Sequence, residues 1–266
     1  MSCSLIISTY NWPQALELCL QSVRQQKVFP AEVIIADDGS KEETNGLIEN
    51  FKQSFPVPLK HVWHPDKGFR LAAIRNKAIA EAPSEYIIQI DGDLVLHPLF
   101  ISDHLDIKKP GYFTAGSRVM LSEATTQQLI QTRSIDVKKY GAPALNTNSF
   151  RSKLLRNFLA ERYKSKGKFR YYVKGCNMAF FKKDLLTING YNESFEGWGC
   201  EDREIAVRLI NSGTKKQFLK NGGICYHLYH KTPSKENEER NECLMKEAMD
   251  KQSTWIEDGL SKYLSA

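Results

Sequence analysis

The sequence lacks the hydrophobic segments of a membrane-spanning or secreted protein. No apolar run approaches the roughly 20 residues that a transmembrane helix requires. The opening MSCSLIIST has no basic stretch ahead of a long apolar one, and the chain then enters a turn at 10–13, so we expect no secretory signal peptide. These absences predict a cytoplasmic protein that can still bind peripherally to the inner face of the cell membrane.

Paired cysteines and low-complexity stretches are also missing. The six cysteines are scattered, with no Cys-x-x-Cys pair, which argues against a zinc ribbon or a redox motif. Glycine (16 residues) and proline (10 residues) are too few for a collagen or a flexible linker. With 266 residues, 41% hydrophobic and 26% charged, the chain is expected to form one large globular domain or two closely joined ones.

The positive charge is small and unevenly distributed. The formal net charge is +6, yet residues 151–174 contain nine Lys or Arg and one Glu, so the rest of the chain is slightly acidic. No nucleic-acid partner is predicted. Segment 151–174 is interpreted as a loop over an active site, or as a patch that meets anionic lipid or a lipid-linked acceptor. A solvated basic helix face is the alternative.

Apolar runs alternate with helical patterns through the first hundred residues. Each run is short and rich in Val and Ile, without polar alternation, as in strands buried on both faces. This β-α-β alternation predicts an α/β fold with a mostly parallel sheet flanked by helices, of the Rossmann-like nucleotide-binding type. The predicted strands are 4–8, 33–36, 59–64 and 86–93, and the predicted helices are 13–26, 44–55 and 68–82.

Acidic residues follow two of these strands at their carboxyl ends, where parallel sheets bind ligands. They are Asp37-Asp38 and Asp91-Gly92-Asp93. Two carboxylates one residue apart suit Mg²⁺ or Mn²⁺ bound together with phosphates. An ordinary Asp-Gly turn is the competing interpretation.

The second half is less regular: FTAGSRVML at 113–121 predicts a strand, and GGICYHLYH at 222–230 predicts a last short strand that carries two histidines. His227 and His230 would add nitrogen ligands and favour Mn²⁺, although surface histidines are common. Glu201-Asp202 begins a predicted helix, where acidic residues either complement the helix dipole or supply a general base. Trp198 stands between glycines and is expected to be an exposed platform for a sugar ring, with a core position as the alternative.

The ordered set of motifs resembles family-2 glycosyltransferases of the GT-A fold. The matching stretches are IISTYNWPQALELCLQSV, VIIADDGSKEET, GFRLAAIRNKAI and YIIQIDGDLVL. The second half resembles β-1,4-galactosyltransferases and the domains of bacterial chondroitin polymerase, through LLTINGYNESFEGWGCEDREIAVRLINSG and YHLYHKTPSKENE. Together they cover roughly residues 3 to 245.

The resemblance implies roles on the donor side of the site. The residues that would line the nucleotide-base pocket are Thr9, Tyr10 and Asp37 or Asp38. Those in the stretch that approaches the donor are Arg70, Arg75 and Asn76, and either arginine could pair with a diphosphate. Asp91 would face the ribose and Asp93 the metal, with His227 or His230 completing the metal site.

The resemblance also implies an acceptor side and a reaction. Trp198 would stack on sugar, Glu201 would hold acceptor hydroxyls, and Asp202 would be the catalytic base. Cys200 departs from the small residue usual at its position. The implied reaction transfers a hexose or N-acetylhexosamine from a UDP-sugar, with inversion and with Mn²⁺ or Mg²⁺, to a glycan or lipid-linked glycan of a bacterial surface polysaccharide.

Two other function classes remain open from the sequence. A sugar-phosphate nucleotidyltransferase also places carboxylates at strand ends, but its usual Gly-rich basic loop after the first strand is absent from TYNWPQ. A carbohydrate-binding protein with a degenerate transferase fold is the other class. The predicted organisation is a nucleotide-sugar half at 1–110, an acceptor and catalytic half at 111–233, and a helical tail at 234–266.

Overall fold

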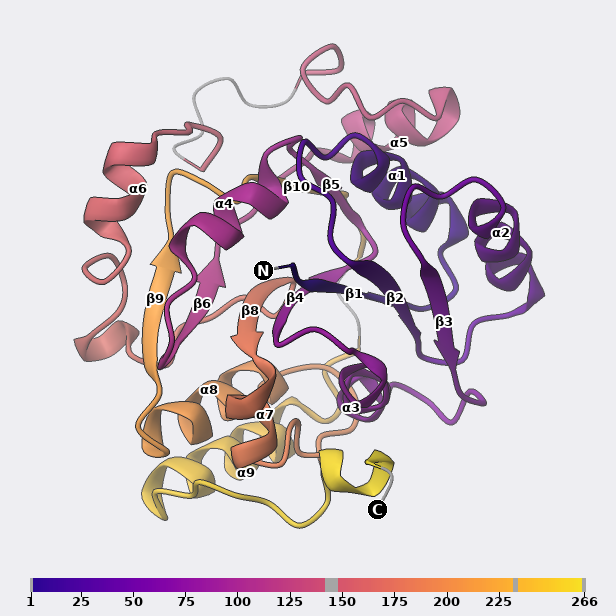
Figure 1. The fold of residues 1–266 in the computed structure, drawn as a ribbon. Helices are drawn as coiled ribbons and strands as arrows, with labels where there is room; N and C mark the ends of the chain where they lie inside the picture. Colours follow the sequence, from indigo (N-terminus) through magenta and orange to yellow (C-terminus); the bar gives the residue numbers. More distant parts are fainter. Residues whose placement is uncertain (1, 142–147, 232–233, 265–266) are drawn as a thin grey trace.

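A seven-stranded mixed sheet forms the centre of the molecule (Figure 1). The computed structural model describes residues 2–141, 148–231 and 234–264. The strand order is β3-β2-β1-β4-β8-β6-β9. The strands are β1 (Ser4–Thr9), β2 (Glu32–Asp37), β3 (Leu59–Trp63), β4 (Tyr86–Asp91), β6 (Tyr112–Gly116), β8 (Asn177–Phe181) and β9 (Lys215–Leu219).

The first four strands confirm the predicted parallel arrangement. β1 lies between β2 and β4, and β2 pairs with β3, all in parallel register. Every residue of β1 and β2 is buried, because helices cover both faces. Along β1, Leu5 and Ile7 enter the core beneath α1 (Pro13–Arg24), while Ile6 enters the opposite core with α3 (Leu71–Glu81).

Helices lie on both sides of the sheet, as the alternation predicts (Figure 1). One face is covered by α1, α2 (Glu42–Lys52) and α4 (Phe100–Ile107). The other is covered by α3, α7 (Lys182–Thr187) and α8 (Glu201–Asn211). The predicted helix 44–55 ends at Lys52, three residues earlier than expected, and the polar turn that precedes Pro56 follows directly.

Strands from the second half complete the sheet. β8 runs antiparallel between β4 and β6, and β6 pairs with β9 in parallel. The sequence did not predict β9, because this short strand begins with two lysines. Lys216 is nevertheless buried, and its Nζ donates to the carbonyls of Phe169 and Tyr172, at 2.5 and 2.9 Å. Since one sheet spans both halves, the division at residue 110 stays a prediction about function.

A second, three-stranded sheet brings distant segments to the edge where β4 ends. Its order is β5-β10-β7, with β5 at Leu94–Leu96, β10 at Cys225–His227 and β7 at Val119–Met120. The single strand expected around 113–121 is therefore two strands in different sheets. The strand expected to carry both histidines ends at His227, so His230 lies beyond it.

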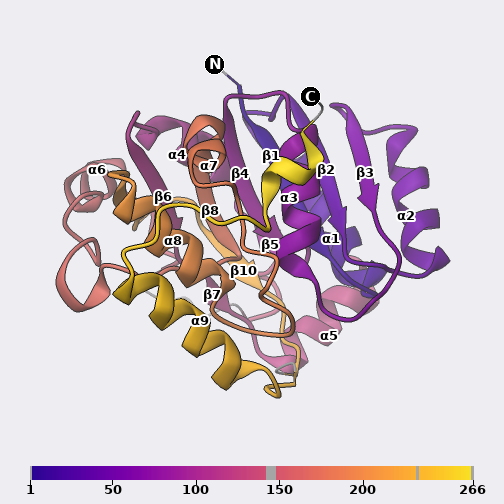
Figure 2. The ribbon, with the colours of Figure 1, turned by 90° about the horizontal axis from the view of Figure 1, so that it is seen from below.

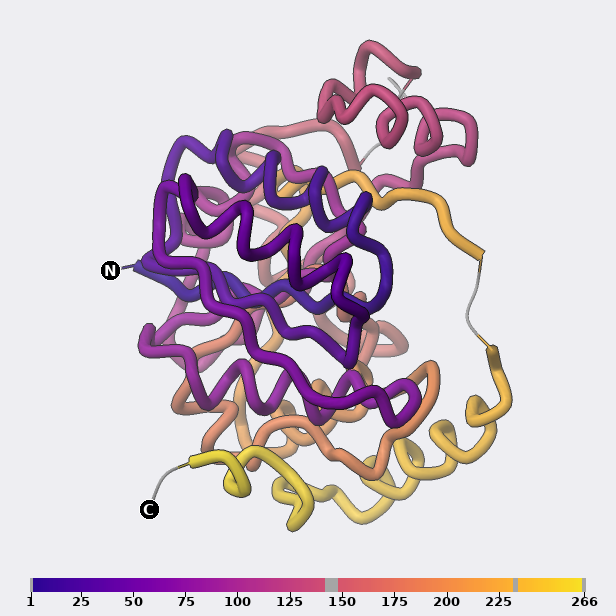
Figure 3. The backbone as a smooth tube through the Cα atoms, turned by 90° about the vertical axis from the view of Figure 1, so that its right-hand side faces the viewer, coloured from indigo at the N-terminus to yellow at the C-terminus, as the bar shows by residue number. Residues whose placement is uncertain are grey.

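The remaining segments lie outside the main sheet. α5 (Glu123–Thr132) packs with the small sheet. The basic segment forms α6 (Lys153–Leu159) and a 3₁₀ turn, η1 (Gly167–Phe169), and the tail forms α9 (Glu238–Asp250) and η2 (Leu260–Tyr263). In Figure 3 the two termini lie on the same side of the molecule.

A buried ion pair stabilises α8, the helix that begins with Glu201. The Arg208 guanidinium donates to both carboxylate oxygens of Glu204, at 2.6 and 2.7 Å, and to the carbonyl of Ile188. Both side chains are buried. Removing either partner alone leaves a charge in the core.

We predict that Arg208→Met lowers the free energy of unfolding by about 3–5 kcal/mol, because the Glu204 carboxylate loses its compensating charge. Urea unfolding followed by circular dichroism measures the change. The double variant Glu204→Met/Arg208→Met removes both charges and should recover most of the loss. A single variant as stable as the double one would contradict this role.

Candidate functional site

The two aspartates after β4 are directed to different neighbours. Between them, Gly92 donates its amide to the Ser8 carbonyl at 2.7 Å. A Cβ at Gly92 would lie 3.1 Å from that oxygen, so the chain passes the end of β1 where a side chain would crowd it. Asp91 then faces α3, and Asp93 faces β10.

Asp93, His227 and His230 form one cluster. Each histidine Nε2 lies 3.3 Å from Oδ2 of Asp93, and one ligand atom from each of the three residues lies within 4.8 Å of the others. The small sheet causes this approach, because His227 pairs with Leu94 and the Leu228 amide bonds the Asp93 carbonyl. The sequence left open which histidine would join Asp93; both do.

Backbone carbonyls determine how both imidazoles present their nitrogens. Nδ1 of His227 lies 2.8 Å from the Leu228 oxygen, and Nδ1 of His230 lies 2.8 Å from the Lys231 oxygen. A carbonyl oxygen only accepts, so each Nδ1 carries a proton. In the neutral rings Nε2 then carries a lone pair, which is directed at Asp93. Metal-binding histidines adopt this orientation.

The cluster fits a divalent cation. Oδ1 of Asp93 is buried without a hydrogen-bond partner, which is costly for a carboxylate oxygen unless a ligand compensates it. Burial lowers the pKa of His227, and this keeps a lone pair available, whereas the hydrogen bond with Asp93 raises the pKa of His230. One oxygen and two nitrogen ligands favour Mn²⁺ over Mg²⁺.

Asp91 belongs to a second cluster, centred on Arg75. The Arg75 guanidinium is 1% exposed and lies 3.0 Å from Asp91 Oδ1 and 3.3 Å from Glu201 Oε1, with its Nε 3.3 Å from the Ser8 hydroxyl. These partners occupy all three guanidinium nitrogens. The contacts thus favour positioning of the two carboxylates over a contact of Arg75 with donor phosphates.

Asn76 is likewise internal. Its side chain is 0% exposed, donates to the Tyr191 carbonyl and to Glu193, and accepts from the Tyr191 amide. Its polar atoms therefore hold the loop before α8 against α3. Direct contact of Asn76 with the donor stays a prediction that these hydrogen bonds do not favour.

Glu201 and Asp202 begin α8, next to a narrow approach of the backbone. Asp202 Oδ2 accepts from the Gly175 amide at 2.8 Å, and a Cβ at Gly175 would lie 3.1 Å from the Asp202 Cβ. Burial first, and then the charge of Asp202, raise the pKa of Glu201 to about 7. Cys200 precedes them with φ 71°, a strained conformation of the kind that clusters at functional sites.

The residues expected around the nucleotide base are grouped, and most of their polar atoms have protein partners. Asp37 accepts from the Ser40 amide and lies 2.9 Å from His61. Asp38 accepts from the Arg70 amide and lies 2.6 Å from His64. Both aspartates and Thr9 are buried, whereas Tyr10 is half exposed and donates to Asp66 at 2.8 Å. The residues that this prediction missed are His61, His64 and Asp66.

Arg70 and Trp198 line a cavity of about 370 Å³. Its walls come from the loop before α3, the loop before α8 and the start of the tail; they include Lys67, Phe69, Gly197 and Asn237. Arg70 Nε is buried without a partner, a donor that an anionic ligand would satisfy. Trp198 is half buried, with Lys235 Nζ 5.3 Å from its ring centre, so it is neither a core residue nor a fully exposed platform.

Arg118 is a further charged residue at this edge, and sequence reasoning missed it. It lies half buried between β6 and β7, donates to the Cys176 sulfur, and its charge acts on Asp91 and His227. The motif FTAGSRVML indicated only a strand, because a single arginine there carries no spacing signal.

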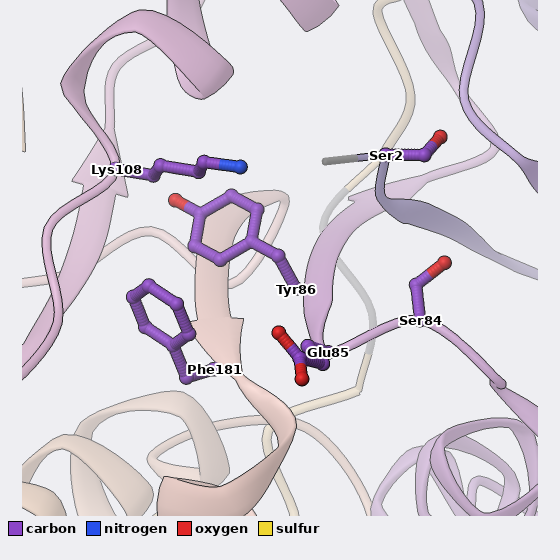
Figure 4. Close-up of a pocket in the computed structure, with 6 residues that line it drawn as sticks. All are labelled: Ser2, Ser84, Glu85, Tyr86, Lys108 and Phe181. Atoms are coloured by element: carbon purple, nitrogen blue, oxygen red, sulfur yellow. The ribbon is translucent and has the colours of Figure 1, made fainter.

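Another hollow, of about 190 Å³, lies at the opposite edge of the sheet. Figure 4 shows Tyr86, Lys108 and Phe181 around it, at the start of β4 and the end of β8. The hollow lies at the amino end of β4, whereas α/β sheets bind ligands at the carboxyl ends of their parallel strands. It therefore lies apart from the clusters described above.

Comparisons with known proteins identify the family and the fold of the chain. The model of glycosyl transferase family 2 matches residues 4–185, and a model described as the N-terminal domain of galactosyltransferase matches residues 156–231. Chondroitin synthases of Pasteurella multocida and Escherichia coli are 30% and 29% identical to this chain, over 88% of its length. The chain spans about a quarter and a third of those relatives, 25% and 35%.

Two solved structures share the fold. Staphylococcus aureus TarS in complex with UDP-GlcNAc is 16% identical with a TM-score of 0.61, covering 92% of this chain and 65% of that one. A Pyrobaculum calidifontis mannosyltransferase in complex with GDP-Man and Mn²⁺ is 17% identical with a TM-score of 0.62, covering 86% and 57%. The α/β architecture is thus that of GT-A glycosyltransferases, and the chain belongs to glycosyl transferase family 2.

Proposed function

We propose that this chain catalyses inverting, metal-dependent transfer of a hexose or N-acetylhexosamine from a UDP-sugar to a hydroxyl of a glycan acceptor. The observation that carries the proposal is the meeting, at one edge of the sheet, of the Asp93–His227–His230 cluster and the Asp91–Arg75–Glu201 cluster. Chondroitin synthases as relatives, and a similar fold crystallised with UDP-GlcNAc, support this donor class.

Asp202 is the proposed general base. An acceptor hydroxyl gives its proton to the Asp202 carboxylate as its oxygen bonds the anomeric carbon. The bond from that carbon to the diphosphate breaks on the opposite face, and UDP leaves with the electron pair. The amide of Gly175 holds Oδ2 of Asp202, so the carboxylate is oriented before the acceptor arrives.

Glu201 is proposed to orient the acceptor beside the base. Its raised pKa, about 7, lets the carboxyl group donate as well as accept a hydrogen bond. The Arg75 guanidinium lies 3.3 Å from Glu201 Oε1 and restrains the Glu201 side chain. This division of work assigns proton removal to Asp202 and hydroxyl binding to Glu201.

Asp93, His227 and His230 would hold the cation, which would supply charge neutralisation to a diphosphate leaving group. Arg70, with its unpaired Nε, is proposed to face the same diphosphate. Trp198 shares a cavity with Arg70, which suits an indole that meets sugar between donor and acceptor. We retain Asp37, Asp38, Thr9 and Tyr10 as the proposed nucleoside-binding wall.

The two competing classes predict different products. A glycosyltransferase releases UDP from a UDP-sugar, whereas a nucleotidyltransferase would release pyrophosphate from a nucleoside triphosphate. A carbohydrate-binding protein would release neither UDP nor pyrophosphate. A bacterial surface polysaccharide remains the proposed context of the acceptor.

A donor screen tests the proposed reaction directly. We expect UDP release from at least one of a panel of UDP-sugars, given with a chondroitin or hyaluronan oligosaccharide, and a strong reduction when Mn²⁺ is chelated. Coupled detection of UDP measures it. Pyrophosphate release from UTP and a sugar phosphate, without UDP release from any UDP-sugar, would replace this function by nucleotidyl transfer.

We predict that Asp202→Asn lowers kcat about 10²–10⁴-fold, because the amide cannot accept the proton of the acceptor hydroxyl. UDP binding, measured by calorimetry with Mn²⁺, should remain within a few-fold of wild type. The exposed carboxylate variant Asp250→Asn is the matched control and should be fully active. Unchanged turnover in Asp202→Asn would exclude Asp202 as the base.

We predict that His227→Ala and His230→Ala each weaken Mn²⁺ binding at least about tenfold, since each removes a nitrogen ligand. Titration of free Mn²⁺ by electron paramagnetic resonance measures this without any substrate. His97→Ala removes a histidine outside the cluster and serves as the control. Wild-type affinity in both cluster variants would show that the ion binds elsewhere.

A further inference from the structure

Helix α6 exposes large apolar side chains on its outer face, where a surface helix normally carries polar ones. Leu154 is 84% exposed and Phe158 is 59% exposed, and they are four residues apart, so they share a face of the helix. Leu155 and, just before the helix, Phe150 are also exposed. Large apolar side chains grouped in this way indicate an interaction surface.

The opposite side of α6 contains a buried arginine. Arg156 is 0% exposed, with NH1 bonded to Asp103 and NH2 2.8 Å from Asp106, both on α4. Arg151 also binds Asp103, at 2.8 Å. Because a buried charge is strongly destabilised without its partners, these ion pairs set the rotation of α6 with its leucines and phenylalanine outward.

Basic side chains lie beside this apolar face and in the stretch of chain that follows it. Arg162 stacks on Phe158, 4.5 Å from its ring centre. Among the described residues, no carboxylate lies within ion-pair distance of Lys166, Lys168 or Arg170, which are all exposed. The acidic residue of the segment, Glu161, is already paired with Lys109 at 2.6 Å. The charges of Lys166, Lys168 and Arg170 are therefore free to act on an external surface, unlike those of Arg151 and Arg156.

The segment also occupies an outer position. α6 lies beyond β9, the last strand of the sheet, at the edge of the molecule in two perpendicular views (Figures 1 and 2). Among the described residues no helix is long and apolar enough to cross a membrane. A surface that combines exposed apolar side chains with basic ones is of the kind that binds bilayers peripherally.

We propose that α6 and the adjoining 162–170 stretch form an interfacial docking surface for an anionic lipid bilayer. Leu154, Leu155 and Phe158 enter the headgroup region, and the neighbouring Lys and Arg side chains bind lipid phosphates. The positive charge of these Lys and Arg side chains favours an anionic bilayer over a neutral apolar partner. This surface is independent of the reaction proposed above.

Vesicle sedimentation tests the surface. The wild type should sediment with phosphatidylcholine–phosphatidylglycerol vesicles, more weakly with phosphatidylcholine alone, and less at high salt. Leu154→Ser/Phe158→Ser should reduce binding about tenfold or more, since burial of the two side chains is lost. Lys166→Gln/Lys168→Gln should reduce it several-fold and lower its salt dependence.

Matched controls alter similar residues elsewhere. Leu186→Ser/Trp255→Ser removes one exposed leucine and one exposed aromatic, and Lys246→Gln/Lys251→Gln removes two exposed lysines; both should bind vesicles as the wild type does. Mn²⁺-dependent UDP binding should be unchanged in every variant, which separates this surface from the catalytic site.

Three results would overturn the proposal. The first is the absence of wild-type binding to anionic vesicles, and the second is wild-type binding by Leu154→Ser/Phe158→Ser. The third is a concentration-dependent dimer in sedimentation velocity that Leu154→Ser/Phe158→Ser abolishes, which would assign the apolar face to a second copy of the chain.

Discussion

The buried guanidinium of Arg75 is the constraint on which the site depends. A cation that is 1% exposed must have compensating charges, and it finds them in Asp91 at the end of β4 and Glu201 at the start of α8. Four elements are thereby joined, because Ser8 of β1 also contacts the α3 arginine. Asp91 and Glu201, which we propose to face the donor and the acceptor, are thus positioned by one side chain that is 126 residues from Glu201 in sequence.

The sequence was sufficient for the parallel half of the fold and insufficient for the rest. Short Val/Ile runs followed by helical periods predicted β1 to β4 with few errors. Both faces of β1, β2 and β4 are buried, whereas β3 lies at the sheet edge and is only partly buried. β9 escaped prediction because a lysine does not indicate a buried strand, and Lys216 is buried only through hydrogen bonds that its Nζ donates to two distant carbonyls. The division of 113–121 into two sheets depends on pairing with β10, a long-range choice that local pattern does not encode.

The site was predictable as a set of residues, and less so as a set of roles. Asp93 and the two histidines follow from the motif order, and the structure unites them because β5 and β10 are neighbours. Arg75 and Asn76 belong to the motif GFRLAAIRNKAI, which resembles the donor-binding stretch of the family, but both side chains are buried. A sequence pattern shows that a residue is required; whether it binds a ligand or orients one depends on burial and partners.

The basic segment acquires its meaning from how it is attached. Arg151 and Arg156 fix its beginning to Asp103, and its end leads to Gly175, whose amide binds Asp202. The segment is therefore attached at its beginning and leads directly to a residue that binds Asp202, while a role as a loop over the active site stays a prediction. Two of its nine basic residues neutralise a buried carboxylate, so the surface they leave is defined as much by exposed leucine and phenylalanine as by charge.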